Sequence, residues 1–122
     1  MARNKKLRMP PVTTIIGHGS MLAGGIEYSG GLHIDGFVGG DVLASEDAAS
    51  SLTVSEGGSI EGNVRVQYLR LDGRIVGDVY VDKRVQLGAR ARIDGDLYYG
   101  LLEMAMGAEV NGELKRLEPV NT

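Results

Sequence analysis

The sequence predicts an all-β domain built as a parallel β-helix, in which the chain winds into coils that stack along one axis. A short pattern recurs, in which two apolar residues two positions apart precede a turn and then the motif apolar-x-Gly-x-apolar. Apolar and polar residues alternate within each copy, as expected for β-strands with one buried face. No stretch keeps the 3.6-residue period of an amphipathic helix. The composition is 43% hydrophobic but only 5% aromatic, with 19 glycines, so the core must be aliphatic.

Six copies of the pattern follow one another, each with a landmark glycine. In chain order they are residues 16 with 22–26, 32–34 with 38–42, 52–54 with 60–64, 69–71 with 75–79, 85–87 with 93–97, and 102–104 with 110–114. The landmark glycines are Gly24, Gly40, Gly62, Gly77, Gly95 and Gly112, with spacings of 16, 22, 15, 18 and 17 residues. The mean, about 17.6, is too short for helical repeats and suits one coil of short strands. About six coils are expected.

Within each copy the landmark glycine is expected where the wall of the coil bends or where neighbouring coils approach closely. One spacing is unusually long. Between Gly40 and Gly62, residues 44–51 are small and polar and fit no strand pattern. They predict a loop that bulges from the second coil.

One domain accounts for most of the chain. We expect a disordered basic tail over residues 1–13, the β-helix over residues 14–117 and a short flexible tail over residues 118–122. The formal charge of −3 is unevenly distributed. The first carboxylate is Glu27, and from there onward the chain carries 9 basic and 16 acidic residues, a balance of −7. The basic tail and the acidic body are expected to have different functions.

No pattern predicts catalytic, cofactor-binding or metal-binding residues. The absence of cysteine excludes disulfides and thiolate ligands, and His18 and His33 have no carboxylate pair at ligand spacing. Residues 17–20 lack the Gly-Lys-Ser/Thr of a phosphate loop, so no nucleotide is expected, and the acidic body argues against direct nucleic-acid binding. No apolar run approaches the roughly 20 residues that span a bilayer, and no signal peptide is evident. A cytoplasmic protein is expected.

The two ends of the stack are the predicted functional surfaces. The first and last coils of a solenoid expose apolar side chains and unpaired backbone groups, which monomeric solenoids usually cover with a cap. This sequence supplies no capping helix or polar terminal coil. We therefore predict that copies of the chain stack into filaments through Ile16, Leu22 and Ile26 at one end and Leu102, Met104, Met106, Val110 and Leu114 at the other.

The N-terminal tail mixes cations with apolar residues. Its candidate contact residues are Arg3, Lys5, Lys6, Leu7, Arg8 and Met9. They suit a solubilising tail, attachment to an anionic inner-membrane surface, or a docking peptide for a partner protein. Each cation near such a surface contributes about 1 kcal/mol, so one tail binds weakly, whereas a filament presents many tails.

Residues 11–17 (PVTTIIG) and 32–42 (LHIDGFVGGDV), followed by the repeated coils, resemble the bactofilins over residues 12–117. The resemblance implies a right-handed parallel β-helix that polymerises end to end without nucleotide. It also implies a cytoskeletal role in cell shape at the cytoplasmic face of the inner membrane, with cell-wall enzymes or chromosome-segregation proteins as partners. The alternative is a trimeric left-handed β-helix acyltransferase of the hexapeptide type, which needs an apolar residue at every sixth position. Val54, Ile60 and Val66 obey that rule, but Asp72 breaks it.

Overall fold

The computed structural model describes residues 12–45 and 49–117, which form strands and turns and no helix. All strand pairs are parallel. The first face of the stack contains β1 (Val12–Ile16), β4 (Gly30–Ile34), β7 (Ser50–Val54) and the second halves of β9 (Val64–Leu71), β11 (Val79–Leu87) and β13 (Leu97–Met104). The second contains β2 (Met21–Ala23), β5 (Phe37–Gly39), β8 (Ser59–Glu61), β10 (Arg74–Val76), β12 (Arg92–Asp94) and β14 (Glu109–Asn111). The third contains β3 (Ile26–Tyr28), β6 (Val42–Ala44), the first halves of β9, β11 and β13, and β15 (Leu114–Arg116).

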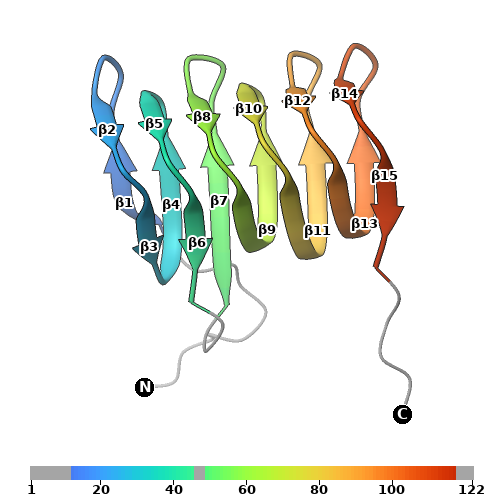
Figure 1. Ribbon diagram of the computed structural model, residues 1–122, viewed down its shortest axis with the longest axis horizontal. Coiled ribbons are helices and arrows are strands. Elements are labelled where there is room, and N and C mark those ends of the chain that lie inside the picture. The colour runs from blue at the N-terminus through green and yellow to red at the C-terminus, as the bar shows by residue number, and fades with distance from the viewer. Residues whose placement is uncertain (1–11, 46–48, 118–122) are drawn as a thin grey trace, which may run out of the picture.

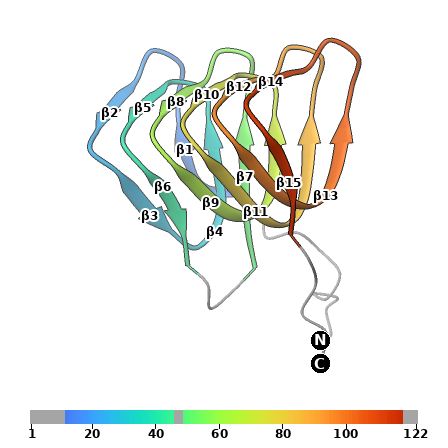
Figure 2. The ribbon, with the colours of Figure 1, turned by 45° about the vertical axis from the view of Figure 1, so that its right-hand side comes forward.

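The chain passes through the three faces in turn, six times. Coil 1 is β1 to β3, and coil 6 is the second half of β13 with β14 and β15. In Figure 1 the first face runs upward behind and the other faces run downward in front, while the chain advances from β1 to β15, which is the right-handed sense. Figure 2 shows the same coils lying one behind another. The predicted all-β, right-handed parallel β-helix of about six coils is confirmed.

The core consists of aliphatic ladders that run along the axis. Ile60, Ile75 and Ile93 are in register across β8, β10 and β12, and each is 0% exposed. Similar ladders of Leu, Ile and Val fill coils 2 to 5, with neighbouring strands about 4.8 Å apart. The polar residues of the same strands face outward, so the alternation predicted from the sequence is confirmed.

The landmark glycines form a column at one corner of the stack. A Cβ atom on Gly77 would lie 2.2 Å from the carbonyl oxygen of Gly62, and one on Gly95 would lie 2.2 Å from that of Gly77. These contacts are with backbone, which cannot move aside as a flexible side chain could. The close approach of successive coils therefore requires glycine here, as the sequence pattern predicted.

At four of the landmark glycines, the residue that follows supplies a hydrogen-bond acceptor to the next coil. The side-chain oxygens of these residues each accept the N–H of the counterpart one coil on, at 3.0 to 3.1 Å, and the last N–H donor is that of Glu113; the acceptor column consists of Asp41, Asn63, Asp78 and Asp96. Corner N–H groups are thereby satisfied without a strand partner. Gly25 holds this place in coil 1, so the column begins only at coil 2.

The loop predicted over residues 44–51 is shorter than expected. Ala44 ends β6, and Ser50 and Ser51 begin β7, where both serines are buried. Small polar composition is misleading here because the Ser50 hydroxyl accepts the N–H of Gln67 at 3.2 Å and is satisfied inside the fold. Residues 46–48 lie outside the described residues.

Candidate polymerisation surfaces

The N-terminal end of the stack presents the inward side chains of coil 1. Ile16, Leu22 and Ile26 are in register with Ile34, Val38 and Val42 of coil 2. The coil 2 residues are 0% exposed, whereas those of coil 1 are only partly buried against them. The three residues predicted from the sequence therefore lie together on one cross-section.

The C-terminal end presents the last rung of the same ladders. Leu102, Met104, Val110 and Leu114 are in register with the buried residues Val85, Leu87, Ile93 and Leu97. Met104 and Leu114 are 43% and 45% exposed, and Leu102 and Val110 are half-buried. Four of the five residues predicted for this end lie on its cross-section.

Met106, the fifth predicted residue, lies at the tip of the turn between β13 and β14. It is 91% exposed and has no place in the strand ladders. Ile15 and Met21 of coil 1 are also well exposed, at 68% and 75%, and are in register with outward residues of coil 2. These three side chains widen the apolar rim of the ends without belonging to the cross-sections.

Three polar residues complete the cross-sections and were missed by apolar pattern matching. Thr14 is in register with Leu32 and Tyr28 with Ala44 at the N-terminal end, and Arg116 is in register with Tyr99 at the C-terminal end. Strand register is the signal that finds them, because each lies two positions from a predicted ladder residue. The Tyr28 hydroxyl donates to the carbonyl oxygen of Ser51 at 2.9 Å, and burial raises the pKa of this phenol well above its ordinary value.

Both ends also present unpaired strand edges. Among residues 12–45 and 49–117, β1, β2 and β3 each pair with only one neighbouring strand, on the coil 2 side, and β14 and β15 pair only with coil 5. Such edges are templates for another chain. Each end therefore combines apolar side chains with backbone donors and acceptors.

The outward surface of coil 6 is tied to coil 5 by charged groups. Arg84 Nη2 lies 2.6 Å from Glu103 Oε2, and Gln86 Nε2 donates to Glu103 Oε1 at 3.0 Å. These bonds from Gln86 and Arg84 hold the Glu103 pKa below its ordinary value, and bonds from Asn111 and Arg74 do the same for the pKa of Asp94. The final coil is thus held by polar bonds besides its strand pairs.

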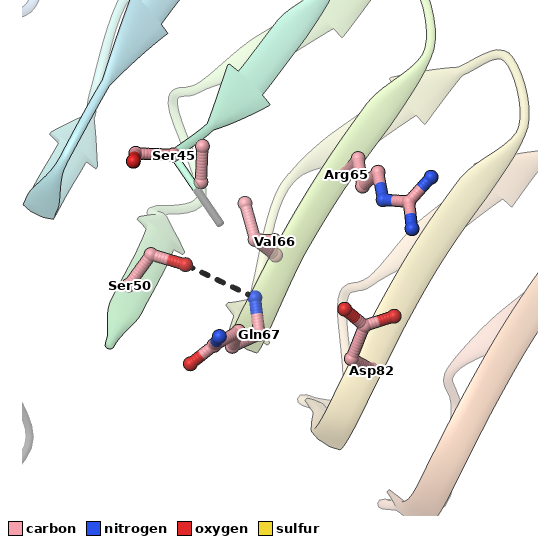
Figure 3. Close-up of a pocket in the computed structure, with 7 residues that line it drawn as sticks. Ser45, Ser50, Arg65, Val66, Gln67 and Asp82 are labelled. Carbon is pink, nitrogen blue, oxygen red and sulfur yellow. Dashed lines mark hydrogen bonds between the residues drawn. The ribbon is translucent and has the colours of Figure 1, made fainter. Parts of the chain in front are cut away.

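A groove lies at the corner between the third and first faces, beside the end of β6. It has a volume of about 590 Å³ and is lined by Glu27, Tyr28, Ser29, Leu43, Ala44, Ser45 and Arg65. A pocket of about 220 Å³ adjoins it and adds Ser50, Val66, Gln67 and Asp82. Figure 3 shows the bond between Ser50 and Gln67 inside this pocket, with Arg65 and Asp82 on neighbouring strands at its rim. Together these two depressions form the corner groove.

The predicted membrane or partner residues Arg3, Lys5, Lys6, Leu7, Arg8 and Met9 lie outside the described residues. Within residues 12–45 and 49–117, no helix is long and apolar enough to cross a membrane. The same part of the chain contains no cluster of three or more His, Asp or Glu side chains suited to a metal ion.

Comparison with known families gives one match across the β-helix. The profile of the family described as "Bactofilin: Polymer-forming cytoskeletal" matches residues 14–115. This range begins within β1 and ends within β15, so it includes all six coils. The family resemblance predicted from the sequence is confirmed.

Two similar proteins support the match. Bactofilin BacO of Myxococcus xanthus (strain DK1622) is 29% identical over 101 residues, covering 83% of this chain and 77% of the relative. The cytoskeletal bactofilin BacA, whose atomic structure was revealed by solid-state NMR, superposes with a TM-score of 0.71 at 33% identity, covering 86% of this chain and 96% of that one. These similarities do not favour the alternative of a left-handed acyltransferase.

Proposed function

Because the chain belongs to the bactofilin family of polymer-forming cytoskeletal proteins, we propose that it assembles end to end into filaments through the two cross-sections, without nucleotide. The main supporting observation is that the ladders containing Leu22 and Leu114 are 0% exposed throughout coils 2 to 5, whereas Leu22 and Leu114 at their ends are only partly covered. A second subunit would supply the missing rung. It would also pair the open strand edges.

The energetics of such a contact are favourable but modest. Stacking two ends would bury on the order of 400 Å² of apolar surface, worth about 10 kcal/mol before association costs. The loss of translational and rotational freedom removes roughly 4–15 kcal/mol. Pairing of the strand edges adds to the gain, so assembly is expected to depend on protein concentration rather than on an energy source.

The geometry favours open growth. The two cross-sections lie at opposite ends of the axis, so each added subunit leaves an end uncovered. Sedimentation of the purified chain with and without ATP or GTP tests the proposal. Equal pelleting above a threshold concentration supports nucleotide-independent assembly, and pelleting only with nucleotide refutes it.

We further propose that residues 3–9 attach the filament to the anionic cytoplasmic face of the inner membrane. The four cations and the apolar Leu7 and Met9 supply the attraction, and the repetition of tails along a filament supplies avidity. Deletion of residues 1–11 should abolish flotation of the filaments with anionic vesicles in a density gradient while leaving assembly intact. Unchanged flotation with the vesicles would contradict this role.

At that surface the filament would serve as a scaffold in cell shape, recruiting cell-wall enzymes or chromosome-segregation proteins. The support is family membership together with a repeated outer surface that many partners could share. A fluorescent fusion carrying Leu114→Arg tests it. Loss of local assemblies together with altered shape or segregation supports scaffolding, and normal cells without assemblies contradict it.

A further inference from the structure

The corner groove lies beside the point where the N-terminal tail joins the body. Val12, the first described residue, is in register with Gly31 of β4. Ser29, which lines the groove, is only two residues before Gly31. The tail therefore begins about one strand spacing, roughly 5 Å, from the chain segment that enters the groove.

The chemistry of the groove complements that of the tail. Leu43 is 37% exposed on the outward face, in register with Glu27 and Arg65, and the half-buried Tyr28 and Ala44 line the groove at the ends of the same strands, so the groove offers apolar contacts. Glu27 and Asp82 are exposed carboxylates along its lining, and Arg65 is its cation. The tail alternates apolar and basic residues at positions 6–9, Lys-Leu-Arg-Met. The apolar side chains of the tail can thus contact the apolar residues of the groove while its basic side chains lie near the carboxylates.

The length and stiffness of the connection suit this contact. Residues 7–11 span at most about 17 Å when extended, which reaches from the strand start across the groove. Pro10 and Pro11 have no backbone N–H, so continuing β1 through them would form fewer hydrogen bonds to β4, and a turn away from the sheet costs little.

We propose that the tail docks in the corner groove of its own chain, with Leu7 and Met9 against Tyr28 and Leu43 and with its cations beside Glu27 and Asp82. Docking hides the residues that the proposed function assigns to the membrane. That consequence rests on the proposed membrane attachment. The tail would then have two alternative binding sites, the groove and the membrane. Anionic lipid and the groove compete for it, so docking lowers the apparent membrane affinity.

Disulfide trapping tests the docking directly, since the chain has no native cysteine. Ser29 and His33 lie two residues before and after Gly31, so they are matched sites on either side of the tail's root. The tail site is Asn4→Cys, paired with Ser29→Cys or with His33→Cys. Under mild oxidation, docking predicts an intrachain disulfide, seen as a product of monomer mass. It should form at least tenfold faster in the Asn4→Cys/Ser29→Cys chain than in the Asn4→Cys/His33→Cys chain. Equal rates would overturn the inference.

A charge reversal then separates docking from mere proximity. Adding Glu27→Lys to the Asn4→Cys/Ser29→Cys chain should slow trapping several-fold, whereas Glu61→Lys, the same charge change on β8, should not. If both changes act alike, the groove does not hold the tail. In the cysteine-free chain, Glu27→Lys should also bind anionic vesicles more tightly than Glu61→Lys. Trapping without any vesicle binding would leave docking standing and refute the membrane proposal, while vesicle binding without selective trapping would refute docking alone.

Discussion

The two ends of the β-helix differ in how their final coil is held. Coil 6 is joined to coil 5 by Arg84–Glu103, by Arg92–Glu109 at 3.6 Å and by the Lys115 ammonium 5.3 Å from the Tyr98 ring centroid. Between the described residues of coils 1 and 2, no side-chain ion pair is present. Coil 1 also lacks the first member of the acceptor column, because Gly25 has no side chain. Apart from the hydrogen bond from the Tyr28 hydroxyl to the carbonyl oxygen of Ser51, it relies on strand pairing and apolar contact.

The difference shows how a polymerising end can be stable without being capped. A cap would cover the cross-section that must receive another subunit, so any extra stabilisation has to come from the outward surface. Coil 6 has that stabilisation, although each exposed ion pair contributes little alone. Exposed apolar side chains occur on both coils, at Ile15 and Met21 of coil 1 and at Leu101 and Met106 of coil 6, so they do not supply the difference. We therefore expect coil 1 to fray more readily in the monomer and to gain more from stacking.

The largest expected effect comes from placing a charge on a cross-section. Leu114→Arg should raise the protein concentration needed for assembly at least about 100-fold, because an unpaired charge would be buried at the contact. Sedimentation and circular dichroism measure assembly and folding separately. Asn111→Arg, in the same coil but facing outward, is the matched control and should assemble nearly normally. Normal filaments of Leu114→Arg would exclude this end from the interface.

The next largest effect is expected from alanine substitutions in the glycine column, which should cost more stability in the interior of the stack than in coil 1. Gly77→Ala should lower the free energy of unfolding by about 3 kcal/mol, since its Cβ would strike the Gly62 carbonyl and its φ of +145° strains an L-residue. Gly24→Ala in coil 1 meets nothing within 4 Å, so only its φ of +93° costs energy, about 1 kcal/mol. Urea unfolding measures both. A larger loss at Gly24 would reverse the comparison.

Hydrogen exchange should resolve the two ends in a single sample. Below the threshold for assembly, the amides of β2 and β3 should exchange about tenfold faster than those of β14 and β15, because they sit in the less tethered coil. Mass spectrometry of peptides from each region provides the rates. Assembly should then slow exchange more in coil 1 than in coil 6; faster exchange in coil 6 of the monomer would contradict the comparison.

The smallest effect is that of the coil 6 ion pairs themselves. Glu103→Gln should speed exchange in β14 and β15 about two- to fivefold, as expected for an exposed pair. Low pH should likewise lower the protection of these amides, measured as the exchange rate relative to the intrinsic rate at the same pH. The folded-state pKa of Glu103 lies below its ordinary 4.5, so its contribution is present above that value and is lost as the pH falls through the depressed pKa. Equal protection of coil 6 in the wild-type chain and in Glu103→Gln at neutral pH would show that these bonds add nothing.

The interior could be predicted from the sequence because alternation and glycine spacing both follow from the geometry of a coil. Ile75 and Gly77 have their places fixed by that pattern alone. The residues of the two end cross-sections could be predicted only in part. Thr14 and Arg116 belong to them because of strand register, and a search for apolar residues does not find these polar side chains. The buried Ser50 escaped detection for the same reason. The attachment point of the tail lies beside the corner groove because Val12 is in register with Gly31, and no local sequence pattern encodes that register.

Electron cryomicroscopy of the purified chain in plain buffer, without nucleotide or metal, tests the central claim most directly. Six coils spaced about 4.8 Å apart predict an axial rise near 29 Å per subunit and a meridional reflection at about 4.8 Å that continues across subunit boundaries. Filaments with these two features would mean that subunits stack through their cross-sections. Discrete trimers, or filaments whose subunits join side by side with a different rise, would contradict it.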